Sequence, residues 1–297
     1  AMMRAAVELG ARGGAGLSLL FPATSLLYRR LGYEHAGTLS RHRLEARHAP
    51  LVGPPLRPAQ GEEDWAAVRD CHDAFAAALH GPGQRPADRW EQLRASAYHF
   101  VLEPEDTVGP IEAYLLYDHV EDPDDWRHQL AVRDWAAVTP RGLRGIVGMV
   151  GRHRSVVTAA TFPGVFPDLW TAFVDEQDVR QIGGMWWMAR GLDLPAAVAA
   201  RGFPPGLSGW VTLAVDDPLL PGASGPWRLE VDGGHGRLSP ATGARVRLDA
   251  RAVGPLFTGF RSPRALALTG LAAGDAAALE WLGGAFASPA PVLLDFF

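Results

Sequence analysis

The chain ends on two adjacent phenylalanines, Phe296 and Phe297, in the stretch PVLLDFF that covers residues 291–297. Chain ends usually carry polar residues, because termini lie in water and fray. Two interpretations fit apolar residues at this place. In the first, the segment is a last strand that docks on the core. In the second, the terminal carboxylate itself is carried into a site shielded from water, where burial raises the pKa of a carboxyl group.

The other reactive side chains follow no catalytic pattern. The ten histidines are scattered and neither an HExxH nor a CxxC spacing occurs, so we predict no metal site. The stretches GLSGW and GASGP lack the second glycine of a nucleophile elbow, which argues against a serine hydrolase. The sequence holds no GxxxxGKS or GxxxxGKT loop and no glycine-rich dinucleotide fingerprint. Cys71 and His72 fall on or beside the inner face of a predicted helix, where packing is the expected role.

The charge and composition of the chain limit the classes of partner that it can bind. The 297 residues carry a formal net charge of −5, whereas nucleic-acid binding needs clustered positive charge, so we predict no nucleic-acid partner. A negative net charge mildly favours a cationic small-molecule substrate. All 28 basic residues are arginine, and alanine, glycine and proline are abundant. This bias indicates a GC-rich, bacterial genome rather than a particular chemistry.

A cytoplasmic location fits the single cysteine, because one thiol forms neither an internal disulfide nor a thiolate metal cluster. No run of about 18 apolar residues occurs, so we predict no membrane-spanning segment. The first residues superficially look like a signal peptide, but Glu8 and several glycines interrupt the apolar stretch.

The start of the chain predicts a helix, a strand and a short helix in that order. MMRAAVELG repeats apolar residues at helical spacing, and GLSLLF (16–21) is typical of a buried strand. The short helix SLLYRRL begins at Ser25, a capping residue, and ends at Gly32. The segment 46–64 is rich in proline and polar residues, which predicts a linker between domains.

The rest of the chain predicts an α/β unit and then an α+β domain with an antiparallel set of strands. The α/β strands are predicted at 97–103, 110–118, 129–138 and 155–162, and the later ones at 184–191, 210–215, 226–232 and 244–250. We therefore predict three domains, at residues 1–50, 51–185 and 186–297.

Three stretches together resemble one family: FPATSLLYRRLGY (21–33), WWMARGLDLPAAVAARGF (186–203) and FASPAPVLLDFF (286–297). They are similar to the Eis (enhanced intracellular survival) proteins, acetyl-CoA-dependent N-acetyltransferases known for modifying aminoglycosides at more than one amine. The resemblance implies a mixed α/β and α+β fold. Its parts would be a GNAT acetyltransferase domain, a second GNAT-like domain and a C-terminal domain like the sterol carrier proteins, assembled as a hexamer.

The resemblance also implies roles for individual residues. Tyr28 would protonate the departing coenzyme A thiolate, and the carboxylate of Phe297 would be the general base. An α-carboxyl with a pKa near ~3.5 is a poor base, but desolvation beside the two phenylalanines raises its pKa. Ala23 and Thr24 occupy the turn that touches the coenzyme in that family. Tyr33 is the alternative acid, although packing beneath the site suits it better.

The 297 residues depart from the family pattern in one respect: they lack the pyrophosphate loop and the strands before it, which the resemblance places ahead of Ala1. We expect the 297 residues to be part of a longer protein; the alternative is a relative that does not catalyse. Two other functions remain open: binding of an apolar ligand by the sterol-carrier-like domain, or a scaffold. Without the family pattern Tyr28 would be a core aromatic on a short helix.

Overall fold

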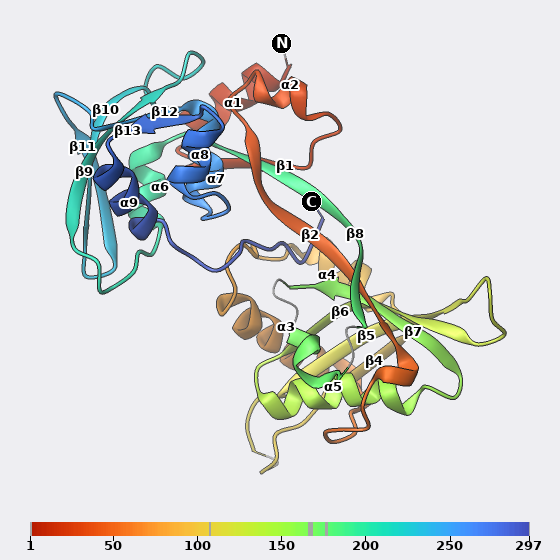
Figure 1. Ribbon diagram of the computed structural model, residues 1–297. Helices are drawn as coiled ribbons and strands as arrows, with labels where there is room; N and C mark the ends of the chain where they lie inside the picture. Colours follow the sequence, from red (N-terminus) through yellow and green to blue (C-terminus); the bar gives the residue numbers. More distant parts are fainter. Residues whose placement is uncertain (1, 107, 166–168, 176–177, 297) are drawn as a thin grey trace. The chain divides into compact units, whose positions relative to one another are not determined.

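The computed structural model describes residues 2–106, 108–165, 169–175 and 178–296, and the chain forms two units within these ranges (Figure 1). Unit 1 takes in the chain up to Thr38 together with Trp186–Pro291 and Phe296. Unit 2 consists of Leu39–Met185 and Val292–Asp295. The domain boundaries predicted after residues 50 and 185 stay predictions. Within the described residues, no helix combines the length and the apolar character needed to cross a bilayer.

Two long strands have residues in both units, and they belong to an eight-stranded sheet of order β1-β8-β2-β7-β6-β5-β4-β3. They are β2 (Glu34–Glu45) and β8 (Val179–Gly191). In unit 2, β2 pairs with β7 in antiparallel register, and Ser40 lies opposite Gly164. In unit 1, β8 pairs with β1 in antiparallel register, and Leu17 lies opposite Gly191.

Unit 2 is a sheet with helices on both faces. Ala113 and Tyr114 are neighbours on β5, so their side chains point to opposite faces. A Cβ on Gly142 of α5 would touch Ala113, while Tyr114 reaches His72 of α3. Strands covered on both faces read as continuous apolar runs, as β5 does. The elements are η1 (Ala46–His48), β3 (Arg57–Pro58), α3 (Gly61–Ala77), α4 (Ala87–Arg94), β4 (Tyr98–Leu102), β5 (Ala113–Glu121), β6 (His128–Ala137), α5 (Pro140–Arg152), β7 (Val157–Gly164) and η2 (Leu169–Phe173).

Unit 1 combines α1, β1 and α2 with a second sheet of five strands, ordered β11-β10-β9-β12-β13. Several of its helices start at Asp or Ser caps; Asp193, for example, accepts the amide proton of Ala196. The elements are α1 (Met2–Arg12), β1 (Leu17–Leu20), α2 (Ser25–Arg29), α6 (Leu194–Ala200), β9 (Gly209–Asp216), β10 (Gly225–Asp232), β11 (His235–Pro240), β12 (Val246–Asp249), α7 (Ala250–Phe257), α8 (Pro263–Leu268), β13 (Ala272–Gly274) and α9 (Ala276–Ala285).

The antiparallel set predicted for the last part of the chain is correct for β9 and β10 and wrong for β12, which runs parallel to β9. The strand β11, which pairs with β10 in antiparallel register, was not predicted. Pro240, the last residue of β11, pairs with Trp227 of β10, which in turn pairs with Leu213 of β9. Val246 of β12 pairs with the same Leu213. Residues 241–245 therefore cross the sheet sideways, and β12 continues in the direction of β11. A hairpin turn would have reversed it.

Candidate functional site

Tyr28 lies on the last turn of α2, and the end of that helix is fixed by a glycine. The amide of Tyr33 donates to the carbonyl of Tyr28 at 3.2 Å, and the amide of Gly32 donates to Arg29 at 3.1 Å. These two bonds form a Schellman ending, which requires a left-handed residue. Gly32 supplies it with a φ of +83°. The helix end predicted from the sequence is confirmed.

A buried arginine stabilises the turn after Tyr28 by a hydrogen bond to its backbone. Arg190 of β8 donates to the carbonyl of Leu31 and pairs with Asp217, and both charged side chains are buried. A buried charge is tolerated only when it is paired and hydrogen-bonded, as it is here. The ion pair therefore couples the position of α2 to the second sheet of unit 1.

Tyr33 is not placed to exchange protons with a ligand. Its side chain is buried, its hydroxyl lies 2.7 Å from Ser18 Oγ, and its ring meets Tyr28 edge-on at 6.1 Å. Burial raises the pKa of the Tyr33 phenol. The packing role expected for Tyr33 agrees with this environment.

The two residues predicted to touch the coenzyme precede α2 and are exposed. Thr24 occupies the N-cap position in extended conformation, and its side chain makes no capping hydrogen bond. Phe297 lies outside the described residues, whereas Phe296 stacks its ring on Phe21 with the ring centres 4.7 Å apart. The structure thus places Tyr28, Ala23 and Thr24 on one short stretch of unit 1.

Unit 2 has the strand, helix and parallel strand that could in principle bind a phosphate at a helix N-terminus. There, however, the side chain of Glu112 occupies the start of α5. Its carboxylate accepts from the Thr139 hydroxyl at 2.5 Å and from Arg141 at 2.9 Å. Its backbone oxygen lies so close to Gly142 that a Cβ there would be 2.5 Å away. The start of α5 is therefore occupied by the ion pair of Glu112 and Arg141.

The gap between the two parallel strands of unit 2 is filled as well. The pairing of β6 with β7 ends at Thr161. Beyond it, the indole of Trp135 donates to the carbonyl of Pro163 at 2.8 Å, and the ring of Trp170 stacks on Phe162 at 3.7 Å. These side chains are part of the core of unit 2.

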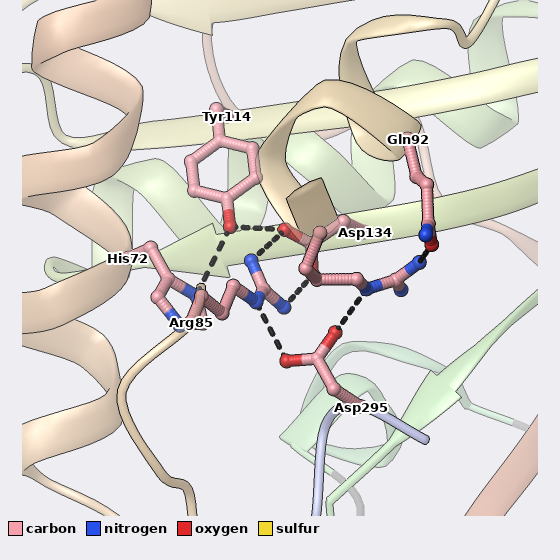
Figure 2. Close-up of polar contacts among 7 residues, drawn as sticks. His72, Arg85, Gln92, Tyr114, Asp134 and Asp295 are labelled. Carbon is pink, nitrogen blue, oxygen red and sulfur yellow. Dashed lines mark hydrogen bonds and ion pairs between the residues drawn. The ribbon is translucent and has the colours of Figure 1, made fainter. Parts of the chain in front are cut away.

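Unit 2 instead contains a buried polar network that the sequence did not reveal (Figure 2). Arg85 donates to both oxygens of Asp134, at 2.6 and 2.9 Å, and only 1% and 3% of the two side chains are exposed. Tyr114 donates to Asp134 at 2.5 Å, and its hydroxyl lies 3.3 Å from Nδ1 of His72. The Nε of Arg85 donates to Asp295, near the end of the chain, at 2.6 Å.

The role of this network is structural, and its side chains do not exchange protons with a ligand. Burial, together with repulsion from Asp134, raises the pKa of the Tyr114 phenol well above its usual value, so this hydroxyl stays protonated. Both carboxylate oxygens of Asp134 already accept from Arg85 or Tyr114. The only sequence signal was an aspartate inside the apolar strand QLAVRDWAAV. Within the described residues, no group of three or more His, Cys, Asp or Glu side chains is arranged to hold a metal ion.

We expect the stability of the protein to fall on mild acidification because of His72. Burial and the charge of Arg85 lower the pKa of His72, so the folded state keeps it neutral. The unfolded chain binds this proton below about pH 6.5, which favours unfolding as the pH falls. Urea unfolding at a series of pH values should show a smaller acid slope for His72→Gln, by up to ~1.4 kcal/mol per pH unit. An unchanged slope would contradict this assignment, although His35, His99 and His119, whose pKa values burial also lowers, retain part of the effect in both proteins.

Two family models match the chain. Residues 81–191 match an acetyltransferase (GNAT) domain, and residues 194–294 match a sterol carrier protein domain. No curated protein matches the chain by sequence. The chain therefore contains an acetyltransferase domain of the GNAT type, and it is an acyltransferase. Ala23, Thr24 and Tyr28 lie outside both matched segments.

Solved structures resemble nearly the whole chain. A GCN5-related N-acetyltransferase from Anabaena variabilis ATCC 29413 has a TM-score of 0.92 at 24% identity, covering 99% of this chain and 76% of that one. One from Kribbella flavida has a TM-score of 0.84 at 29% identity, with coverage of 99% and 74%. Eis1 from Mycobacterium abscessus has a TM-score of 0.78 at 22% identity, with coverage of 99% and 76%. The predicted mixed fold with a GNAT part and a C-terminal sterol-carrier-like domain is confirmed.

Proposed function

We propose that this GNAT acyltransferase transfers the acetyl group of acetyl-CoA to primary amines, aminoglycosides among them, in the manner of the Eis family. The observation that carries the proposal is the position of Tyr28, on a short helix between β1 and β2 whose end is fixed by the Gly32 turn. The exposed Thr24 beside it leaves its side chain available to the coenzyme. We further propose a cytoplasmic hexamer.

Direct transfer needs one base and one acid. The substrate ammonium, with a pKa of roughly 8 to 10 by analogy with protein amines, gives a proton to the carboxylate of Phe297, directly or through water. The neutral amine attacks the thioester carbonyl, and backbone N–H groups stabilise the oxyanion. The carbon–sulfur bond then breaks and Tyr28 gives its proton to the thiolate, while the nitrogen loses its second proton to the resulting tyrosinate, directly or through water. The products are an acetamide and coenzyme A.

The test is an assay of the full-length natural protein with acetyl-CoA and a panel of aminoglycosides. We expect thiol release that depends on both substrates, and a product heavier by one acetyl group for each amine modified, seen by mass spectrometry. Simple alkylamines serve as the comparison, since they lack the extra cationic groups of an aminoglycoside. Absence of amine-dependent thiol release across the panel would refute the proposal.

Binding of an apolar ligand by the sterol-carrier-like domain is the less favoured function. This domain does contain an apolar cavity, which Leu213, Leu229, Phe257 and Phe286 help to line. Its volume is only about 40 Å³. An engineered protein cavity of ~150 Å³ holds a single benzene. As it stands, the cavity is therefore too small for a sterol or an acyl chain.

A further inference from the structure

The helix that carries Tyr28 is too short to hold its place by itself. α2 has five residues, and none of them is fully buried. Helices shorter than about 12 residues are marginally stable in water, so contacts with the rest of the fold have to stabilise one of this length. Leu26 and Leu27 are exposed, while the partly buried ring of Tyr28 packs against the core of unit 1. The position of Tyr28 therefore depends on the polar contacts of its neighbours.

Arg29, the residue after Tyr28, makes such a contact with Glu34 at the start of β2. The Nε of Arg29 donates to both carboxylate oxygens, at 2.9 and 3.1 Å, and its Nη2 donates to one of them at 2.7 Å. The amide of His35 donates to the same carboxylate at 3.0 Å. These residues all belong to unit 1. Because β2 lies beside β8 in the sheet, the contact joins α2 to a paired strand.

The burial of Glu34 makes this ion pair asymmetric. Only 6% of the Glu34 side chain is exposed, against 38% of the Arg29 side chain. Burial alone would raise the pKa of Glu34, but the hydrogen bonds from Arg29 and from the His35 amide outweigh it and hold this pKa below its usual value. Glu34 is therefore ionised at neutral pH. A carboxylate buried to this degree has to be paired and hydrogen-bonded, so Glu34 keeps Arg29 beside it.

A second contact holds the first residue of α2. Ser25 Oγ lies within hydrogen-bond distance of Nε2 of His35, at 3.0 Å. The turn after the helix is closed by Gly32, whose positive φ does not depend on the ion pair. Both features remain when Glu34 is changed. We therefore expect such a change to loosen the residues around Tyr28 rather than to unfold α2.

We propose that Glu34 is a positioning residue for Tyr28, which it holds in place by binding Arg29, the next residue of α2. The inference rests on the proposed function, in which the Tyr28 hydroxyl protonates the departing thiolate. An acid must lie within hydrogen-bond reach of the atom that it protonates. A misplacement of about 1 Å can cost a reaction 10²-fold. Glu34 acts through Arg29 and needs no contact with either substrate.

The variant that tests this is Glu34→Gln in the full-length protein. The glutamine keeps the shape of the side chain and an oxygen for the His35 amide, and it removes the charge that holds Arg29. Arg29 is partly exposed, so water can solvate it. Replacing Arg29 would instead leave Glu34 buried without its cation and endanger folding. We expect kcat to fall by about 10- to 10²-fold in Glu34→Gln.

Two kinetic readouts distinguish a displaced acid from a general loss of structure. The loss in Glu34→Gln should shrink with acetyl thioesters of more acidic thiols, because such thiolates leave without being protonated. In a Tyr28→Phe background, Glu34→Gln should have no further effect on kcat, since no acid remains to be positioned. An equal loss for all thioesters, or losses that multiply in the double variant, would mean that Glu34 does not act through Tyr28 and would overturn the inference.

The chain offers a matched control in Asp275→Asn, also in unit 1. Arg245 donates to the two oxygens of Asp275, at 2.8 and 2.9 Å, and the amide of Ala278 donates to one of them at 2.9 Å. The carboxylate thus has the same kinds of partner as Glu34, although it is exposed. Asparagine also caps helices well, so α9 should keep its start. This variant should leave kcat unchanged. A loss as large as that in Glu34→Gln would contradict a specific role for Glu34.

Hydrogen exchange separates this inference from the proposed function, because it needs no acetyl transfer. The amides of Leu31 and Tyr33 donate to the carbonyl of Tyr28, at 2.9 and 3.2 Å, so their exchange reports on this end of α2. We expect both amides to exchange at least about tenfold faster in Glu34→Gln than in the wild-type protein or in Asp275→Asn, since local opening exposes them.

The combined outcomes decide between the two proposals. Unchanged exchange in Glu34→Gln would show that the ion pair does not hold α2. Faster exchange with unchanged kcat would overturn the positioning of Tyr28. A wild-type protein without acetyl transfer, but with the expected exchange rates, would refute the proposed function and leave the anchoring of α2 by Glu34 standing.

Discussion

One glycine added after Phe297 is expected to abolish acetyl transfer, slowing turnover by at least 10²- to 10⁴-fold, the usual contribution of a general base. The addition turns the carboxylate of Phe297 into an amide, which has no basic oxygen at neutral pH. The new carboxylate lies about 3.6 Å further along the chain. Thiol release measures the loss. Urea unfolding should show an unchanged midpoint, because no packed side chain is removed.

Phe297→Leu is the matched control for this extension. It keeps the terminal carboxylate and an apolar side chain while removing the ring, so we expect turnover to stay within about tenfold of the wild type. An extended protein that acetylates amines at the normal rate would show that the carboxylate is not the base. A leucine variant as inactive as the extended protein would point to the ring instead.

The second large effect is expected for Tyr28→Phe, which should slow turnover by about 10²- to 10⁴-fold. The substitution removes the phenolic proton and keeps the ring, which packs partly buried against the core of unit 1 and edge-on to Tyr33. Stability should therefore change little. The loss should shrink when the acyl donor carries a more acidic thiol, because such a thiolate leaves without being protonated. Kinetics with a series of acetyl thioesters measure this.

Tyr33→Phe is the control for position 28, because it removes the neighbouring hydroxyl. That hydroxyl bonds to Ser18, so the expected cost is one partly buried hydrogen bond, about 1 kcal/mol of stability. The turnover rate should stay within a few-fold of the wild type. If Tyr33→Phe and Tyr28→Phe exchanged these outcomes, Tyr33 would be the acid. If the loss in Tyr28→Phe were the same for all thioesters, a role in leaving-group protonation would be excluded.

The sequence predicted the ends of helices wherever a single residue type determines the backbone conformation. Gly32 predicted the end of the helix that carries Tyr28, because only a residue tolerant of positive φ completes that turn. Thr139, whose side chain accepts from the Gly142 amide, and Pro140 likewise mark the start of α5 by their residue types. The motif around Tyr28 and the stretches near the end of the chain also led to the GNAT and sterol-carrier-like parts, which the comparisons confirm.

Pairing between distant segments was decided only by the tertiary structure. Arg85 meets Asp134 and Asp295 across 49 and 210 residues of chain, and no periodicity or motif links the three. The same holds for Glu112, which closes the start of α5, and for Trp135, which fills the gap beside β7. By itself the sequence determined which elements form, because backbone conformation depends on a few neighbouring residues. Which charged side chains become buried neighbours depends on how the sheet aligns its strands. That alignment is seen only in the folded chain.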